Sequence, residues 1–288
     1  MNAFTRFFAL IAAFFTMLFA PSSPVEKKTD VTVMTYNILC DDLTDERLDA
    51  VVQQIRAVKP DSFGCQEVKD YSKIYLQDVL KEYDSFCVSD ESSNVTYNTL
   101  FWLKSKFKKL DQGYVFLSLT PSKPSTGWDA AHRRTLQWVL LEDIKTGCRF
   151  VHANTHIDYA ETAGKESMKL IEKYLGSFEY PVIVSGDFNS RYTGEAIKSL
   201  KEMGWKNTMN MCGINSSKDT YHGYTGEDAN HSPIDHIFVK DIDSAKNWKI
   251  HKEMYNGMYP SDHFALSVEL HLSYFITAKE NYELIKNS

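Results

Sequence analysis

Side chains whose types suit acid–base and metal chemistry lie where several predicted strands end. They are Asn37, Glu67, His156 with Asp158, Asp187 with Asn189, Asp235, and Asp262 with His263. Polar residues at the strand ends of an α/β sheet converge on one crevice, where a binding site is expected. Their carboxylate and amide oxygens suit a hard cation such as Mg²⁺, with Mn²⁺ as the alternative. Zinc fits poorly, because none of the five cysteines stands in a zinc-ligand spacing.

Each of these motifs also has an ordinary structural interpretation. The run 186–190 consists of residue types that dominate turns, and the run 261–263 could be a loop or a helix cap. His156 follows an apolar strand and could be a buried, hydrogen-bonded core histidine, while Glu67 could be a surface acid. Asp235 is more informative, because a carboxylate between apolar neighbours in a strand needs a partner or a metal.

The hydrophobic pattern predicts the elements that position these residues. Apolar residues recur at helical spacing from Leu48 to Val58, and Pro60 ends that helix. Further helical patterns cover about 165–175 and 195–203. Strand-like runs occupy 31–36, 62–66, 100–103, 114–119, 136–141, 149–154, 181–185, 234–239 and 264–270. Because β-α-β units alternate with strand pairs that lack a helix between them, we expect packed sheets with helices outside.

Two further segments carry weaker expectations. The polar stretch 215–232 is typical of a long surface loop, and loops of this length are often functional. The tail after Tyr274 has the pattern of a short amphipathic helix.

Composition excludes several classes of protein. Hydrophobic residues make up 43% of the 288 residues and charged residues 24%, which argues against disordered, collagen-like and disulfide-scaffold chains. The formal charge is −6, so the long-range field repels polyanions rather than gathering them. A basic surface that tracks the phosphates of long nucleic acid is therefore not indicated.

The N-terminus has the pattern of a secretory signal. Arg6 precedes the apolar run Phe7 to Ala20, which is short for a spanning helix of about 20 residues. We expect residues 1–27 to be a signal peptide and spacer, with cleavage near Ala20 to Pro24, and residues 28–288 to be one domain of a secreted or periplasmic protein. The alternatives are an uncleaved membrane anchor and a buried N-terminal helix.

Six motifs follow one another in order between residue 31 and about residue 270. They are Thr35-Tyr36-Asn37-Ile38-Leu39, Gln66-Glu67, Asn154-Thr155-His156, Gly186-Asp187-Phe188-Asn189, Ile234-Asp235-His236-Ile237-Phe238 and Ser261-Asp262-His263. Together they resemble the endonuclease/exonuclease/phosphatase superfamily, the metal-dependent phosphoesterases related to DNase I. The stretch 127–134 also resembles a bacterial-type branch of that superfamily. The resemblance implies a four-layer α/β/β/α sandwich of two mixed sheets flanked by helices.

The resemblance implies metal ligation and water activation by one group of residues. Glu67 would be the main metal ligand, assisted by Asn37 and Asp262. Asp187 would orient and deprotonate the attacking water, and Asn189 would hold a phosphoryl oxygen. This division suits an acceptor-only carboxylate beside an amide donor.

A second group of residues would handle charge and protons. Asp235 and His263 would form a dyad in which the carboxylate stabilises the imidazolium, so that His263 acts as general base or holds charge on the phosphoryl group. His156 would donate to a nonbridging oxygen or protonate the leaving oxygen. Arg134 would pair bidentately with phosphate, for which guanidinium geometry is suited.

Departures from particular family members bear on the substrate. Leu39 stands where AP endonucleases of the superfamily carry Asp, which disfavours abasic-site repair. Residues 36–41 resemble the opening of CCR4-type deadenylases, but a secretory signal fits poorly with cytoplasmic mRNA turnover. We therefore expect a secreted, Mg²⁺-dependent phosphoesterase acting on phosphodiesters, with a nuclease-type substrate ahead of lipids or small phosphomonoesters.

Two alternatives to this expectation stay open. One is a sphingomyelinase-like or inositol-phosphate-directed phosphoesterase, and the other is a non-catalytic secreted binding module on the same fold. A serine hydrolase is excluded by the lack of a Gly-x-Ser-x-Gly elbow. The expected partner is a phosphate-ester substrate, with nucleic acid among the candidates. No stable protein partner is implied, and we expect a monomer.

Overall fold

The computed structural model describes residues 24–39, 44–88, 97–215, 218–228 and 231–276. By its internal contacts the chain forms two units, residues 28–273 and the terminal residues 1–27 with 274–288. The sheets, the hydrophobic cores and the candidate site are described within the unit of residues 28–273. None of the helices in the described ranges is long and apolar enough to cross a membrane.

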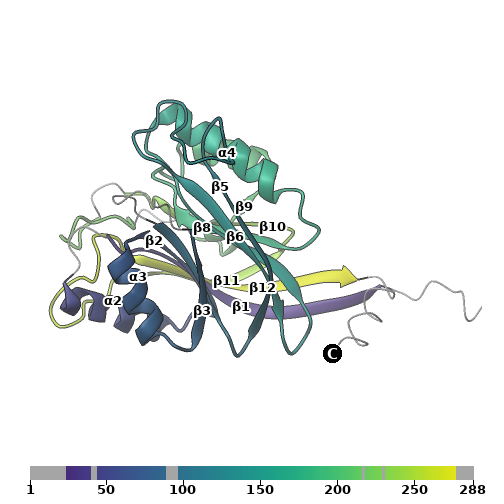
Figure 1. Ribbon diagram of the computed structural model, residues 1–288, viewed down its shortest axis with the longest axis horizontal. Helices are drawn as coiled ribbons and strands as arrows, with labels where there is room; N and C mark the ends of the chain where they lie inside the picture. Colours follow the sequence, from purple (N-terminus) through teal and green to yellow (C-terminus); the bar gives the residue numbers. More distant parts are fainter. Residues whose placement is uncertain (1–23, 40–43, 89–96, 216–217, 229–230, 277–288) are drawn as a thin grey trace, which may run out of the picture. The chain divides into compact units, whose positions relative to one another are not determined.

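Among the described residues, the first sheet has six strands in the order β11-β12-β1-β2-β4-β3 (Figure 1). The strands are β1 (Val25–Asn37), β2 (Ser62–Val68), β3 (Tyr83–Cys87), β4 (Tyr97–Leu103), β11 (Ser244–His251) and β12 (Ala265–Ile276). β1 and β2 are parallel, whereas β2 pairs with β4 and β11 with β12 in antiparallel fashion, so the sheet is mixed.

The second sheet also has six strands in the described ranges, in the order β5-β6-β7-β8-β10-β9. They are β5 (Phe107–Phe116), β6 (Thr135–Asp143), β7 (Arg149–His156), β8 (Val182–Asp187), β9 (Lys206–Asn207) and β10 (Asp235–Lys240). β7 and β8 are parallel, and β10 runs antiparallel to β8. The end of β8 and the start of β10 therefore lie at the same edge of the sheet.

Helices cover the outer face of each sheet. On the first sheet, α2 (Asp45–Val58) and α3 (Asp70–Val79) bury apolar residues against β1 and β2. On the second, α4 (Glu161–Leu175) and α5 (Glu195–Glu202) pack on β7, β8 and β10. A short helix, α6 (Thr208–Met211), follows β9. These layers confirm the predicted α/β/β/α sandwich.

The predicted helix over 48–58 is confirmed, and its ends have clear physical causes. The Thr44 side chain accepts a hydrogen bond from the backbone N–H of Arg47 and caps the first turn. At the other end, Lys59 adopts a left-handed backbone with φ of 54° and donates to the Ile55 carbonyl. Pro60 then prevents further helix.

A buried histidine links the two sheets. Nδ1 of His152 on β7 lies 2.7 Å from Oγ of Ser62 on β2, and its Nε2 lies 3.0 Å from Oγ of Ser185 on β8. Ser62 Oγ donates to the Phe101 carbonyl, so His152 donates to Ser62 through Nδ1 and leaves Nε2 as an acceptor. Burial lowers the pKa of His152 to about 3.

Several elements differ from the predictions. The sequence pattern missed α3, β3 and β11, and β5 begins at Phe107 rather than near residue 114. The stretch 215–232 was expected at the surface, but its described part buries Asp219, Thr220 and His222. β12 continues to Ile276, and the helix expected after Tyr274 falls mainly on residues 277–288, outside the described residues.

Candidate active site

Strand register brings the predicted residues to one edge of the second sheet. His156, the last residue of β7, is paired with Asp187, the last residue of β8, and Asp187 is paired in turn with Asp235, the first residue of β10. On the first sheet, Asn37 ends β1, and Glu67 lies next to the end of β2. Asn37 contacts both Glu67 and Asp187, so residues of the two sheets meet at this edge.

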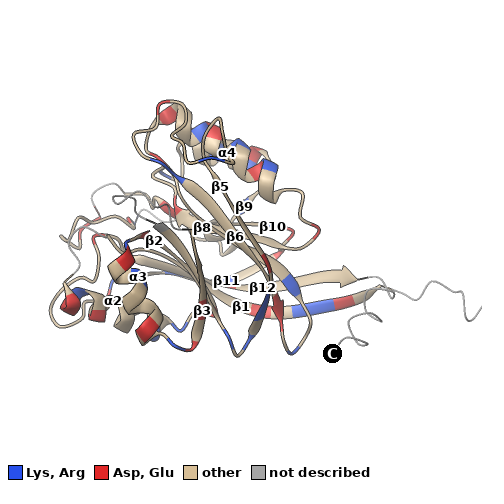
Figure 2. Ribbon diagram, viewed as in Figure 1, with Lys and Arg blue, Asp and Glu red and all other residues tan. Residues whose placement is uncertain are grey.

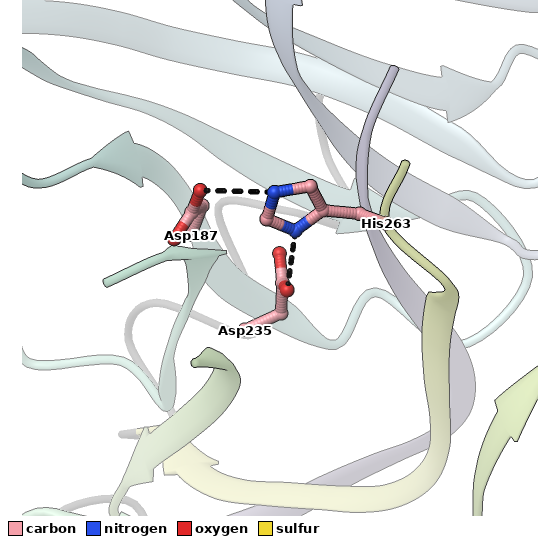
Figure 3. A group of neighbouring side chains, drawn as sticks. All are labelled: Asp187, Asp235 and His263. Carbon is pink, nitrogen blue, oxygen red and sulfur yellow. Dashed lines mark hydrogen bonds and ion pairs between the residues drawn. The ribbon is translucent and has the colours of Figure 1, made fainter. Parts of the chain in front are cut away.

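The buried group formed by Asp187, Asp235 and His263 lies at the centre of the site (Figure 3). His263 Nδ1 is 2.9 Å from Asp235 Oδ2, and its Nε2 is 3.8 Å from Asp187 Oδ2. Burial alone would lower the pKa of His263, but the charges of Asp235 and Asp187 raise it well above its ordinary value. The imidazole is therefore held as an imidazolium between two carboxylates.

Asp187 is the carboxylate that the other groups surround. Burial raises its pKa, and the charge of Asp235 raises it further, while His263 opposes both effects. Its Oδ1 accepts the backbone N–H of Asn189 at 2.8 Å, and its Oδ2 accepts from Asn37 Nδ2 at 3.1 Å. These contacts fix the direction in which Oδ2 faces the site.

Glu67 and Asp262 form an acidic pair beside this group. The pKa of Asp262 is raised by burial, against the effect of His263, and the charge of Glu67 raises it further. Two carboxylates that repel each other at one place offer the oxygen donors that a hard divalent cation prefers. The donor set of this pair thus fits Mg²⁺ or Mn²⁺. The Asp187–Asp235–His263 group fits a cation less well, because an imidazolium has no free lone pair for a metal.

Asn37 holds a position between the two acidic groups. Its Nδ2 donates to Glu67 Oε1 and to Asp187 Oδ2, each at 3.1 Å, and its Oδ1 accepts the backbone N–H of Leu39. In this arrangement Asn37 links the carboxylates as a donor. Oδ1, the atom through which Asn37 would bind a metal, keeps a second lone pair beside the one that accepts the Leu39 N–H.

His156, Asn189 and Arg134 lie on the opposite side of Asp187. His156 Nε2 is 3.4 Å from Asp187 Oδ2 and 3.0 Å from Asn189 Nδ2. Its Nδ1 is 2.9 Å from Nη1 of Arg134, whose side chain is 11% exposed. Burial lowers the pKa of His156 well below its ordinary value, and the charge of Arg134 lowers it further, so this imidazole is neutral.

Two residues of the site adopt a left-handed backbone without being glycine. Glu67 has φ of 56° and Asn189 has φ of 46°. In Glu67 this conformation coincides with a register shift between β2 and β4 from Cys65 to Val68, a bulge that re-aims the side chain. For Glu67 such a conformation costs of order 1 to 2 kcal/mol, whereas asparagine adopts it more readily, so the Glu67 backbone is held in place by the surrounding contacts.

The segment 218–228 supports the site, and the length of the polar stretch that contains it was the one sequence feature pointing to a function. Oγ1 of buried Thr220 accepts the backbone N–H of Ile234 at 3.1 Å and of Asp235 at 3.0 Å, which positions the start of β10. Tyr221 forms a β-bridge with His263, and their rings lie 5.1 Å apart. Tyr221 is 39% exposed, so it lies where the candidate site meets the surface.

A family model described as the endonuclease/exonuclease/phosphatase family matches residues 34–263. The chain belongs to this family, whose members are phosphoesterase hydrolases that generally depend on divalent metals. A comparison with curated proteins finds no match.

Three solved structures with the same fold illustrate the similarity. The mannosyl-6-phosphatase of Bacteroides thetaiotaomicron is 26% identical, with a TM-score of 0.76, over 83% of this chain and 99% of that one. An endonuclease/exonuclease/phosphatase of Bacteroides vulgatus is 29% identical, with a TM-score of 0.75, over 85% and 99%. TDP2 of D. rerio, complexed with a single-strand DNA product, is 17% identical, with a TM-score of 0.67, over 85% and 99%, and shows the fold alone.

Proposed function

We propose that this protein hydrolyses phosphate esters with a bound divalent cation, Mg²⁺ or Mn²⁺. The observation that carries the proposal is the meeting of the Glu67–Asp262 acidic pair with the Asp187–Asp235–His263 group at one edge of the sandwich. A cation bound by Glu67 and Asp262 would neutralise charge on the phosphoryl group.

Other residues of this chain would move the proton and stabilise charge in the reaction. Asp187, held by Asn189 N–H and Asn37, accepts a proton from the attacking water and orients it. His263, charged through its contact with Asp235, holds negative charge that develops on the phosphoryl oxygens. His156 and Asn189 offer further donors on the other side of Asp187.

A nuclease-type phosphodiester is the substrate class that the sequence favours. Two observations favour a second candidate, a small phosphomonoester such as a sugar phosphate. One is the similarity to a mannosyl-6-phosphatase. The other is a pocket of about 270 Å³ beside Asn189 that is lined by Tyr159, Glu161 and Glu195. Its carboxylates accept hydrogen bonds from hydroxyl groups and repel additional phosphates.

The distribution of charge also supports a small substrate. Acidic and basic residues are interspersed along α4, rather than gathered into a basic surface there (Figure 2). The whole chain carries a formal charge of −6. Long nucleic acid is bound chiefly through its phosphates by clustered Lys and Arg.

The first test compares hydrolysis of p-nitrophenyl phosphate and bis(p-nitrophenyl) phosphate in Mg²⁺, Mn²⁺ or EDTA. The variant Asp187→Asn should lower kcat by roughly 10² to 10⁴-fold. The matched control Asp243→Asn, at a side chain 93% exposed, should leave it unchanged. Faster cleavage of the diester supports the nuclease-type substrate, and faster cleavage of the monoester supports the small phosphate ester.

The proposal fails if neither ester is turned over with any metal, or if EDTA leaves the rate unchanged. Mannose 6-phosphate and single-stranded DNA should be included as natural esters, because an activated leaving group can conceal a requirement for contacts to the rest of the substrate. Metal binding without turnover of any ester would favour the non-catalytic binding module.

A further inference from the structure

The ring of His156 lies between two hydrogen-bond donors. Its Nδ1 is 2.9 Å from Nη1 of Arg134, and its Nε2 is 3.0 Å from Nδ2 of Asn189. A neutral imidazole has one nitrogen that accepts and one that carries a proton. The two contacts therefore cannot both be hydrogen bonds from the neighbour to the ring, and the stronger donor decides which ring nitrogen stays unprotonated.

Arg134 is the stronger donor, because its hydrogen bond to the ring is charge-assisted. A guanidinium has no acceptor, so any hydrogen bond between Nη1 and Nδ1 requires an unprotonated Nδ1. The side chain is largely buried, and its Nε lies 3.9 Å from Oδ2 of Asp158. That carboxylate is itself fixed by the backbone N–H groups of His132 and Ala160. The ion pair with Asp158 and the contact with Nδ1 of His156 hold the guanidinium, and the ring proton then lies on Nε2.

The amide of Asn189 is held in one orientation. Its Nδ2 also donates to the Ile157 carbonyl at 3.0 Å. Reversing the amide would place Oδ1 against that carbonyl oxygen, and two acceptors repel each other. Nε2–H of His156 and Nδ2–H of Asn189 are then two donors 3.0 Å apart, which repel each other until an acceptor takes both hydrogens. One anionic oxygen placed beside both nitrogens would accept from both.

We infer that Arg134 is a positioning residue that fixes the proton of His156 on Nε2, so that His156 and Asn189 form a two-donor site for one phosphoryl oxygen. The identity of that oxygen rests on the proposed phosphoesterase function, whereas the proton position does not. This role differs from the bidentate phosphate binding that the family resemblance implies for Arg134, because Nη1 is already engaged by His156.

The test combines a spectroscopic and a kinetic measurement on the full-length protein. Nitrogen-15 spectra of histidine-labelled protein distinguish the protonated from the unprotonated ring nitrogen through two-bond couplings, and the variant His156→Gln identifies the His156 signals among the nine histidines. Steady-state hydrolysis of p-nitrophenyl phosphate supplies kcat and KM separately. Both are measured for Arg134→Met, Arg134→Lys and Arg134→Gln.

We expect Nε2–H alone in the unmodified protein and in Arg134→Lys, since an ammonium also only donates. Arg134→Met should show both proton positions, and Arg134→Gln should shift toward Nδ1–H because its Oε1 can accept. In these two variants kcat should fall about 10- to 100-fold with KM changed less than about threefold, while Lys restores most of kcat. Arg149→Met makes the same substitution at the other end of β7, where the side chain pairs with Glu142, and should change neither readout.

Three results would overturn the inference. The first is Nε2–H retained in both Arg134→Met and Arg134→Gln. The second is a raised KM with unchanged kcat, which would make Arg134 only a phosphate ligand. The third is a ring proton on Nδ1 in the unmodified protein. If no ester is hydrolysed at all, the proposed function fails while the spectra still decide the role of Arg134. Thermal unfolding of each variant checks that it folds. If Arg134→Met does not fold, Arg134→Gln is used in its place for both measurements.

Discussion

Asp235 pairs with His263 through Oδ2, while its Oδ1 has no hydrogen-bond partner within the described ranges. A buried carboxylate needs a charged partner, and here that partner is the imidazolium of His263. Replacement by an amide of the same size would keep the shape and remove the charge. The dyad can therefore be tested with little disturbance to packing.

We predict that Asp235→Asn lowers kcat by roughly 10² to 10⁴-fold, because the neutral amide cannot stabilise a charged His263. The measurement is hydrolysis of p-nitrophenyl phosphate at saturating substrate and metal. Asp243→Asn on the exposed turn after β10 is the control for the loss of one carboxylate. A kcat within threefold of the unmodified protein would show that the charge of Asp235 does not act in the reaction.

Glu67 should decide metal affinity. Removing one of two carboxylates from a cation site weakens binding, because affinity follows the number of charged ligands. We predict that Glu67→Gln raises the Kd for Mg²⁺ at least about tenfold, as measured by titration calorimetry. Glu82→Gln offers a control outside the site. Unchanged affinity would indicate that the cation binds elsewhere, for example at the Asp187–Asp235–His263 group.

The side chains that meet at the candidate site could be picked out from the sequence, but the residues that hold them could not. Asp187 and His263 follow or precede strong strand patterns, and their types suggest chemistry by themselves. Thr220 lies in a polar stretch that is typical of an exposed loop, and nothing local indicates that its hydroxyl caps the start of β10. A residue that acts through a backbone contact distant in sequence leaves no local pattern.

Among the elements, β7 carries one of the contacts that join the two sheets, since its His152 lies between Ser62 and Ser185. Burial lowers the pKa of His152 to about 3, whereas in the unfolded chain a histidine titrates near 6.5. The unfolded state therefore takes up a proton as the pH falls below 6.5, and the folded state does not until about pH 3. The contribution of His152 to the free energy of unfolding is complete above pH 6.5 and is lost as the pH falls from 6.5 to about 3.

We predict that the free energy of unfolding falls by about 1.4 kcal/mol per pH unit from this histidine alone between roughly pH 6 and 4. His152→Gln removes the titration and should show a shallower slope. Urea unfolding at several pH values measures both. Equal slopes in the two proteins would contradict the assignment of this loss to His152.

The elements that the sequence pattern missed share a physical cause. In β5, Phe107 is buried but the five residues after it are exposed, so the alternation that marks a strand is absent there. α3 buries only Ser72 and Leu76, which leaves too narrow an apolar face to detect. β5 forms because it pairs with β6, and α3 forms because it packs against β1 and β2. Local propensity alone specifies neither element.

For the molecule as a whole, the sequence of residues 1–27 predicts where the protein is delivered and how it is processed. We predict that a cell recognising the signal exports the protein and shortens it between residues 20 and 24. Mass spectrometry of the exported chain and its N-terminal sequence measure this directly. If protein in the membrane fraction has a mass that includes residues 1–20, the uncleaved anchor is favoured.

The left-handed backbone of Glu67 has a consequence for how this protein can change over time. Glycine adopts that conformation freely, which relieves roughly 1 to 2 kcal/mol of strain against a glycine entropy cost of about 0.5 to 1 kcal/mol. We predict that Glu67→Gly keeps or slightly raises the melting temperature while abolishing hydrolysis. A marked fall in melting temperature would refute this. Selection for thermal stability alone would then favour inactive descendants, and only selection for turnover would keep the Glu67 side chain in place.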